Sequence, residues 1–318
     1  MPFFNKKAAK NLIVCAIDGQ QCRLNYFDKS TEDLILSSTT TFEYAEEAEL
    51  AQNLQAWCKQ NVAKGAACRW LLSHDLYQTY NVDKPSVDET EMAQALKWQI
   101  KDQLDFPVDA VLLCYYQPNH PDPQDKQLVA VTVEKKLVES LITLTHSVHL
   151  TMESIEIEEL AIGQALLPYL GDGKIVGYVG EDNSGLVFNF YLDNQLCFTR
   201  HKKGRFMPKT PGQEFSLEAD DAQIKERETQ QENFLLETQR TLDYVISQLF
   251  RKPIDKLLLL QRLGSGESGD NSAGELLQTL QQLTDTPVSL VTSEHDLTPV
   301  DENLPTLAEL GCATRVEI

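Results

Sequence analysis

The sequence carries two similar strand–turn–strand segments, one in each half of the chain. The first spans 11–27 and turns at Asp18 and Gly19, and the second spans 174–192 and turns at Gly180. Runs of β-branched and aromatic residues that end at glycine or aspartate are typical of hairpins. Because each hairpin opens its half of the chain, the pair predicts two α/β lobes that hold a ligand between them.

Length and charge limit what the chain can be. Its 318 residues are many for one core and sufficient for two lobes. The 48 acidic and 28 basic residues give a net charge of −20 at pH 7. A protein this acidic repels phosphate backbones and anionic membrane surfaces, so we expect no nucleic-acid partner and no broad membrane adhesion.

The apolar runs, the cysteines and the histidines indicate a cytoplasmic protein without a metal site. No apolar run is long enough to span a bilayer, and the earliest one stops at Asp18, too soon for a signal peptide. The seven cysteines have no CxxC spacing, which is typical of buried thiols in a reducing compartment. The six histidines share no pattern of metal ligands.

The first half, 1–170, is predicted to form one α/β lobe with a small inserted subdomain. Strands are expected at 34–36 and 68–73, and apolar residues at helical spacing predict a helix at 46–64. Within 75–133, an amphipathic helix and a pair of strands predict a separate small α+β unit.

The second half, 171–318, repeats the plan of the first. A long helix is expected at 227–251 and a buried strand at 257–260, with a last short helix near Thr306. The polar segment 201–226 contains prolines and glycines, and we interpret it as a surface loop. The second lobe is therefore predicted to have its own sheet and its own covering helices.

Several segments in this order resemble the PilM-like proteins, the actin-like cytoplasmic components of type IV pilus machinery. The segments are Phe4–Lys7, Ala95–Asp109, Asp193–Arg200, Gln239–Tyr244 and Leu310–Arg315. Each motif alone is weak, but their order and spacing hold over nearly the whole chain. Within this family, the chain length and the small number of glycines are most similar to those of the members from mannose-sensitive haemagglutinin (MSHA) pilus systems.

The resemblance implies an actin-like, ribonuclease H-like fold of two lobes with an inserted small subdomain. It also implies a scaffold at the cytoplasmic face of the inner membrane. There the protein would bind the N-terminal cytoplasmic peptide of a PilN- or MshJ-like single-pass membrane protein, and connect it with other platform or motor components. Membrane association would be peripheral, through that partner.

An actin-like nucleotide site needs glycine turns in both lobes and carboxylates that hold Mg²⁺. Asp18 and Gly19 are present in the first turn. In the second turn Gly180 is present, but the expected carboxylate before it is missing, and Asp182 lies beyond the turn. We therefore interpret these four residues as a vestigial nucleotide cleft, with no catalytic residue and no cofactor expected; bound ATP and Mg²⁺ remain the alternative.

By the resemblance, the small subdomain and the first lobe form a groove that accepts a short peptide. Trp98, Phe106 and Tyr115 are its candidate walls, because aromatic side chains provide large contact areas in recognition sites. The alternative is that these side chains fill the subdomain's own core. The two interpretations are equal for Tyr115, and the core is favoured for Phe106.

Two other functions stay open. One is an active or ATP-binding ATPase of the same pilus machinery, which the missing second carboxylate disfavours. The other is an adaptor like GspL of type II secretion, a relative with a membrane-spanning helix after its cytoplasmic part, whereas this chain ends at Ile318 without one. The basic cluster 200–205 is interpreted as a solvated loop, with a docking patch as the alternative.

Overall fold

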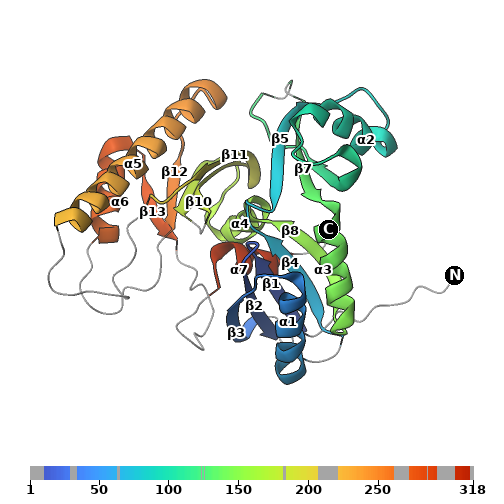
Figure 1. Ribbon diagram of the computed structural model, residues 1–318. Helices are drawn as coiled ribbons and strands as arrows, with labels where there is room; N and C mark the ends of the chain where they lie inside the picture. The colour runs from blue at the N-terminus through green and yellow to red at the C-terminus, as the bar shows by residue number, and fades with distance from the viewer. Residues whose placement is uncertain are drawn as a thin grey trace. The chain divides into compact units, whose positions relative to one another are not determined.

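The computed structural model describes most of the chain (Figure 1). The described residues are 11–28, 34–62, 65–122, 124, 126–181, 184–206, 221–260, 272–284, 286–291 and 305–315. The chain divides into two compact units. The first comprises Met1–Gln117, Lys126–Ala165 and Glu294–Ile318, and the second comprises Pro118–Asp125 and Leu166–Ser293.

The central sheet of the first unit has five strands in the order β3-β2-β1-β4-β8. These strands are β1 (Asn11–Ile17), β2 (Gln21–Asp28), β3 (Ile35–Glu43), β4 (Ala67–Leu72) and β8 (Thr151–Ile157). β1 pairs antiparallel with β2 and parallel with β4, and β4 pairs parallel with β8. The carboxyl ends of β1, β4 and β8 therefore lie along one edge of the sheet.

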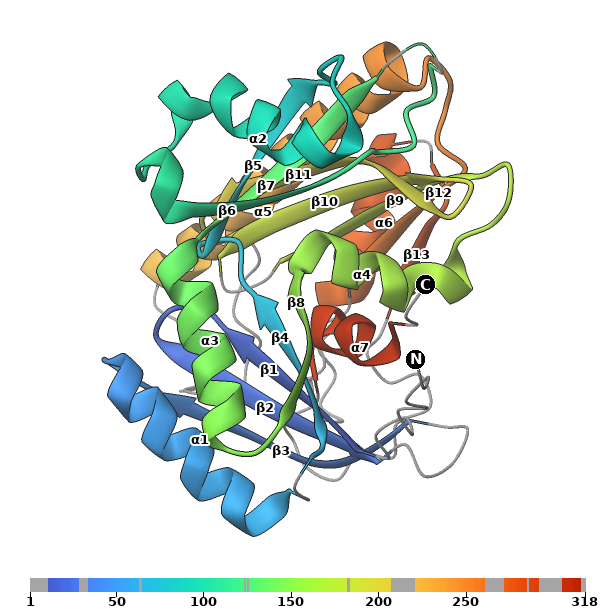
Figure 2. The ribbon, with the colours of Figure 1, turned by 90° about the vertical axis from the view of Figure 1, so that its right-hand side faces the viewer.

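Helices cover both faces of this sheet (Figure 2). One face carries α1 (Glu47–Asn61) and α3 (Lys135–Ser147), and the other carries α4 (Glu158–Leu166) and α7 (Leu307–Thr314). α1 follows the sequence pattern closely, since its buried residues Leu50, Leu54 and Cys58 are four apart. Their side chains join Trp70 of β4 in one apolar cluster.

A second, smaller sheet lies within the first unit, while Pro118–Asp125 of the predicted subdomain belongs to the second unit. Its strand order is β5-β7-β6. The strands are β5 (Tyr77–Asp83), β6 (Val111–Tyr116) and β7 (Gln127–Glu134). The helix α2 (Glu89–Gln99) is followed by two short 3-10 turns, η1 (Lys101–Gln103) and η2 (Val108–Ala110). Met92 and Leu96 of α2 bury their side chains against Leu113 and Leu128 of the sheet.

The second unit contains another sheet of five strands, in the order β11-β10-β9-β12-β13. These strands are β9 (Ile175–Glu181), β10 (Gly185–Leu192), β11 (Gln195–Lys203), β12 (Lys256–Leu260) and β13 (Val288–Val291). Its helices are η3 (Leu167–Tyr169), α5 (Asp221–Tyr244), its π-helical end η4 (Val245–Leu249), and α6 (Ser272–Thr284). Phe234 and Leu242 of α5 pack with Phe188 and Phe190 of β10 in its core.

The last segment of the chain departs from the predicted division at residue 170. Glu294–Ile318 belongs to the first unit, whereas the sequence was divided so that it fell in the second lobe. The physical reason is Arg69 on β4, which is 5% exposed. Its guanidinium donates hydrogen bonds to the carbonyls of Cys312 and Arg315, at 2.8 and 2.9 Å.

The segment 201–226, expected to be one surface loop, contains regular structure at both ends. β11 continues to Lys203, and α5 already begins at Asp221. Lys209 and its neighbours in 207–220 lie outside the described residues. The polar composition that suggests a loop is shared by the start of α5, so composition alone does not separate the two states.

Six of the seven cysteines are buried and one, Cys114, is exposed. Cys15 and Cys68 lie on neighbouring strands with 3.8 Å between their sulfur atoms. Burial raises the pKa of the Cys58 and Cys197 thiols to about 12. Because only the thiolate is nucleophilic, the buried thiols are inert at neutral pH.

This burial makes a quantitative prediction for a thiol titration. Ellman's reagent is expected to modify about one thiol per native chain within minutes, because only Cys114 is exposed. All seven should react in denaturant. The Cys114→Ser variant serves as the control and should show no fast reaction. Fast modification of two or more thiols in the native protein would contradict the buried positions.

Candidate functional site

The carboxyl edge of the first sheet gathers polar residues that follow three parallel strands. Asp18 follows β1, His74 lies two residues after β4, and Glu158 and Glu159 follow β8 at the start of α4. In open α/β sheets, ligands bind outside the carboxyl ends of the strands. This edge is therefore the first place to look for a binding site.

Asp18 and Gly19 form the tight turn between β1 and β2 that the sequence predicted. The Asp18 Oδ1 accepts hydrogen bonds from the backbone N–H groups of Gln20 and Gln21, at 3.1 and 2.7 Å. Gly19 has a φ of +92°, a conformation that favours glycine. The aspartate thus serves its own turn, which is the common role of this residue in hairpins.

His74 lies between two carboxylates of α4. Its Nδ1 forms an ion pair with Glu158, and its Nε2 lies 3.3 Å from Glu159 Oε1. The Tyr77 hydroxyl donates to the other Glu159 oxygen. The side chains of His74 and Glu159 are 4% and 3% exposed. The cluster thus joins the segments that follow β4 and β8.

This cluster is not indicated by any motif in the sequence, since His74 has no second histidine at the spacing of metal ligands. The cluster could have been predicted from position in the sequence, because His74 follows one strand and the two glutamates follow another, and these two strands are parallel neighbours. In the part of the chain that the structure describes, no group of three or more histidine, cysteine or acidic residues could hold a metal ion.

Glu159 should make the first unit sensitive to acid. Burial raises its pKa, but the hydrogen bond and charge of His74 and the hydrogen bond from Tyr77 lower it more, so the net pKa is below the ordinary 4.5. A carboxyl group with a lowered pKa adds stability above its unfolded pKa, and this is lost as the pH falls through the folded pKa. The urea midpoint of the wild type should therefore fall more steeply between pH 6 and pH 3 than that of Glu159→Gln. Glu49→Gln, an exposed change on α1, should keep the wild-type slope; equal slopes for all three proteins would contradict the expectation.

In the second unit the predicted turn at Gly180 is wrong, because Gly180 lies within β9 and pairs with Val187 of β10. Gly180 is required by packing, because a Cβ there would lie 2.2 Å from the Tyr178 hydroxyl and 3.2 Å from the Leu260 Cβ. The next residue, Glu181, is 5% exposed and its Oε1 accepts a hydrogen bond of 2.6 Å from the Phe206 N–H. Asp182 lies outside the described residues. A carboxylate is thus present directly after Gly180, a feature that the sequence analysis missed, but it holds the backbone at Phe206.

The three candidate partner-binding residues all lie in the small subdomain, with different exposure. Trp98 on α2 is 57% exposed and Phe106 is 45% exposed. The preference for a core role of Phe106 is therefore wrong: the residue lies after η1, where the chain turns toward Pro107 and β6, and its ring stays at the surface. Tyr115 is half-buried against the subdomain core, and its hydroxyl donates to Glu89.

Exposed large apolar side chains are frequent in this subdomain. Val87 and Leu112, at 38% and 37% exposure, add to Trp98 and Phe106. The Trp98 ring also has the Lys101 ammonium 5.9 Å from its centroid. Large apolar and aromatic side chains that stay exposed are often part of interaction surfaces. The subdomain is therefore the candidate partner-binding region of the first unit.

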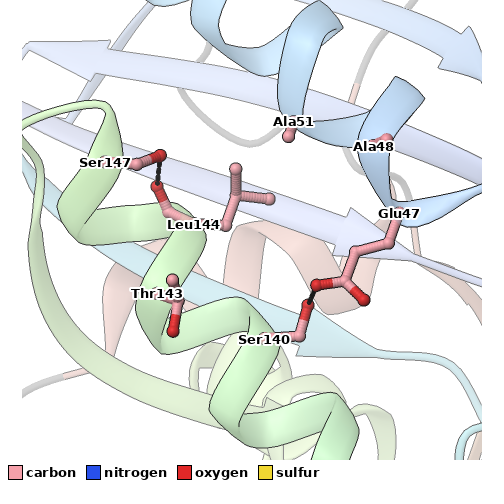
Figure 3. Close-up of a pocket in the computed structure, with 7 residues that line it drawn as sticks. All are labelled: Glu47, Ala48, Ala51, Ser140, Thr143, Leu144 and Ser147. Carbon is pink, nitrogen blue, oxygen red and sulfur yellow. Dashed lines mark hydrogen bonds between the residues drawn. The ribbon is translucent and has the colours of Figure 1, made fainter.

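A groove of about 430 Å³ lies between α1 and α3 (Figure 3). Its lining residues are Glu47, Ala48, Ala51, Ser140, Thr143, Leu144 and Ser147. The Ser140 hydroxyl donates to Glu47, and the hydroxyls of Thr143 and Ser147 donate to carbonyls of their own helix. The groove thus offers small side chains whose polar atoms are already bonded, an arrangement that suits packing and not catalysis.

Two of the motif segments that carried the resemblance make contacts that stabilise the fold, whereas Phe4–Lys7 lies outside the described residues. Arg200, at the end of one motif, forms an ion pair of 2.6 Å with Glu237 and a hydrogen bond to Thr241 of α5. In the closing motif, Gly311 lies against α4 and Arg315 pairs with Glu156. Sequence similarity at these positions therefore reports the architecture and not a binding site.

Comparisons with solved structures identify this architecture. The chain is similar to the PilM–PilN type IV pilus biogenesis complex, with a TM-score of 0.63, 14% identity, and coverage of 90% of this chain and 89% of that one. It is also similar to a Bacteroides thetaiotaomicron protein with an actin-like ATPase fold and unknown function, with a TM-score of 0.52, 9% identity, and coverage of 92% and 94%. The cytoplasmic domain of EpsL, an inner-membrane component of the type II secretion system of Vibrio cholerae, gives a TM-score of 0.47 at 9% identity, with coverage of 96% and 94%.

The predicted actin-like α/β fold is confirmed. No protein-family model matches the sequence, and no curated protein matches it. Among the described helices, none is both long enough and apolar enough to cross a bilayer.

Proposed function

We propose that this chain is a non-catalytic, actin-like scaffold of type IV pilus biogenesis that binds the N-terminal cytoplasmic peptide of a PilN- or MshJ-like inner-membrane protein. The likeness to the PilM–PilN complex covers 90% of the chain and supports this role. The size and the 15 glycines resemble MshI, the PilM-like protein of MSHA systems. The protein would be cytoplasmic and would reach the inner membrane, and other platform or motor components, through its partner.

The observation that carries the proposal is the internal bonding of the strand-end groups. Asp18 bonds to its own turn, His74 Nε2 lies 3.3 Å from Glu159 Oε1, and Glu181 bonds to the Phe206 N–H. A nucleotide site needs such groups directed at phosphate and Mg²⁺. Groups that already stabilise the fold can serve a nucleotide only at the cost of those bonds.

The small subdomain offers the complementary support. Trp98 and Phe106 keep large apolar surface in water, which is unfavourable unless a partner covers it. Aromatic side chains of this kind dominate the binding energy of many interfaces. We therefore propose Trp98, Phe106 and Tyr115 as residues of the partner-binding surface.

Capture of the partner from membranes tests this function. The tagged chain, used as bait with detergent-solubilised membranes, should retain a small single-pass pilus-platform protein identified by mass spectrometry. The double variant Trp98→Ala, Phe106→Ala should retain at least about tenfold less, since truncating such anchors typically removes more than 1–2 kcal/mol. Ile35→Ala, which removes another exposed apolar side chain of the first unit, is the matched control.

The outcomes separate the proposal from its alternatives. Recovery of type II secretion components would favour a GspL-like adaptor. Recovery of no pilus-platform protein, with the bait folded, would overturn the proposed function. Equal capture by the wild type and the double variant would leave the scaffold role intact and remove Trp98 and Phe106 from the surface.

A further inference from the structure

The strand β6 is an unusual edge strand. It pairs only with β7 in the described three-stranded sheet, and Figure 2 shows the three strands side by side next to α2. Its six residues, Val-Leu-Leu-Cys-Tyr-Tyr, carry no charge. Soluble proteins normally protect a free edge with lysine, proline or a bulge, because a bare apolar edge invites pairing with another chain.

The hydrogen-bonding phase of the sheet tells which groups of β6 face outward. The Lys84 N–H donates a hydrogen bond to the Lys126 C=O. Backbone hydrogen bonds in an antiparallel pair recur at every second residue, so the even-numbered residues of β5 and β7 are the ones that bond to each other. The odd-numbered residues of β7 then bond to β6, among them Val131, which lies opposite Cys114. The N–H and C=O groups of Leu113 and Tyr115 are therefore directed away from β7.

An independent contact supports this phase. The Val111 C=O belongs to the same outward set as those of Leu113 and Tyr115, and it accepts a hydrogen bond of 2.7 Å from Lys97 Nζ of α2. Lysine thus protects the first outward carbonyl. For Leu113 and Tyr115, no partner of the outward backbone groups occurs within the described part of the chain. Four main-chain groups remain available to a new strand.

The side chains beside this edge are apolar. Leu112 is 37% exposed and Cys114 is exposed on the face opposite α2. The other edge strand, β5, instead exposes Thr79, Asn81 and Asp83. A peptide that adds to β6 can bury apolar side chains as well as satisfy the backbone, whereas one that adds to β5 cannot.

The charge of the subdomain indicates the chemistry of the added strand. Residues 75–133 contain ten acidic and four basic residues, a net charge of −6. Glu89 is bonded to Tyr115, Asp109 lies just before β6, and Glu134 lies opposite Val111. Lys97 is the basic side chain bonded to β6. A segment with lysine or arginine is favoured here over an acidic one, and a second copy of this acidic chain is disfavoured.

We propose that the outer edge of β6 binds an extended, cationic peptide segment by adding it as an antiparallel strand. This inference rests on the proposed function, because it specifies how a partner's tail would be held. The added strand would exchange hydrogen bonds with Leu113 and Tyr115, and it would place a residue opposite Cys114 as a non-hydrogen-bonded pair. The Cα atoms of such a pair lie about 4.5 Å apart, within the range that a disulfide spans.

Cys114 therefore allows a direct test with defined probes on the native protein. The probes are acetyl-Lys-Val-Cys-Val-Lys-amide, the same peptide with glutamate in place of both lysines, and the same peptide with proline in place of both valines. Each probe is added as its mixed disulfide with 2-mercaptoethanol, in a buffer of reduced 2-mercaptoethanol, and the protein–probe disulfide is quantified by intact mass. The Cys114 thiolate attacks the probe's cysteine sulfur, the S–S bond to 2-mercaptoethanol breaks, and 2-mercaptoethanol leaves as the thiol, so the exchange needs no other oxidant.

The lysine probe should give a mixed-disulfide equilibrium constant at least about tenfold above both others. Glutamate loses the charge attraction, and proline removes the two N–H groups that would bond to β6. Equal constants for all three probes would overturn the proposal. Equal constants for the lysine and proline probes would mean that charge attraction alone favours the lysine probe, which would overturn strand addition. A dominant Cys114–Cys114 dimer would show that a second copy of this chain occupies the edge. Failure of membrane capture with an intact lysine preference would overturn the proposed function and not the edge.

Discussion

Replacing Gly311 with alanine is expected to destabilise the first unit by about 3 kcal/mol or more, among the largest effects of any single change in this protein. A Cβ at Gly311 would lie 1.7 Å from the Ala161 carbonyl oxygen and 3.1 Å from the Ala165 nitrogen. Both are backbone atoms of α4, so neither can move aside as a side chain would. Helix α7 would have to shift away from α4 and from the sheet beneath it.

Urea unfolding followed by circular dichroism measures this effect as a lower midpoint for Gly311→Ala. The matched control is Gly171→Ala, where the nearest atom to the new Cβ is the flexible Lys174 Cγ at 3.4 Å. The control should change the free energy of unfolding by less than about 0.5 kcal/mol. A Gly311→Ala protein as stable as the control would show that α7 does not lie against α4 as described.

Replacing Arg69 with methionine is expected to cost about 3–5 kcal/mol of stability. The guanidinium is nearly buried and binds three partners: the carbonyls of Cys312 and Arg315 and the carboxylate of Glu153, which is 2.8 Å away. Methionine fills much of the same volume but donates no hydrogen bond. The carbonyls at the end of α7 and the Glu153 carboxylate would then lose their partner, and unsatisfied groups of this kind are costly.

The control for Arg69→Met is Lys135→Met, which breaks an exposed ion pair of 3.6 Å with Glu139. Exposed pairs one helical turn apart contribute only about 0.3–0.5 kcal/mol, so this variant should remain close to the wild type. In Arg69→Met, limited proteolysis should also release the C-terminal helix earlier than in the wild type. Comparable stability of the two variants would contradict the role of Arg69 in holding α7.

Most of the sheet structure could be predicted from the sequence, for a physical reason. The strands at 11–17 and 175–181 are buried along their length, and such strands appear as short apolar runs that end at turn residues. The Asp18-Gly19 turn is local, so two residues suffice to specify it. The helix α1 was equally clear, because its buried residues recur every four positions.

Long-range packing could not be predicted in the same way. The docking of α7 onto β1 and β4 depends on Arg69, which lies more than 240 residues earlier in the chain. No spacing within 305–315 indicates which sheet the helix joins. The cluster of His74, Glu158 and Glu159 has the same origin, because two parallel strands bring together residues 84 positions apart.

The candidate site was predicted in part, and the errors are informative. Trp98 lies two residues from the buried Leu96 of α2, so helical spacing puts it on another face, and its exposure follows from that spacing. The core role favoured for Phe106 is wrong, because this residue follows a short 3-10 turn, where local spacing does not indicate a buried face. The edge of β6 was not recognised, since strand order within a sheet is a property of the fold and not of the strand's own sequence.

The claim that the strand-end groups serve the fold is tested most directly by calorimetric titration of the native chain with Mg-ATP. We predict no saturable binding at micromolar nucleotide, because Asp18, Glu159 and Glu181 are bonded within the protein. Micromolar binding that is lost in Asp18→Ala would contradict this prediction and would support an ATP-binding function.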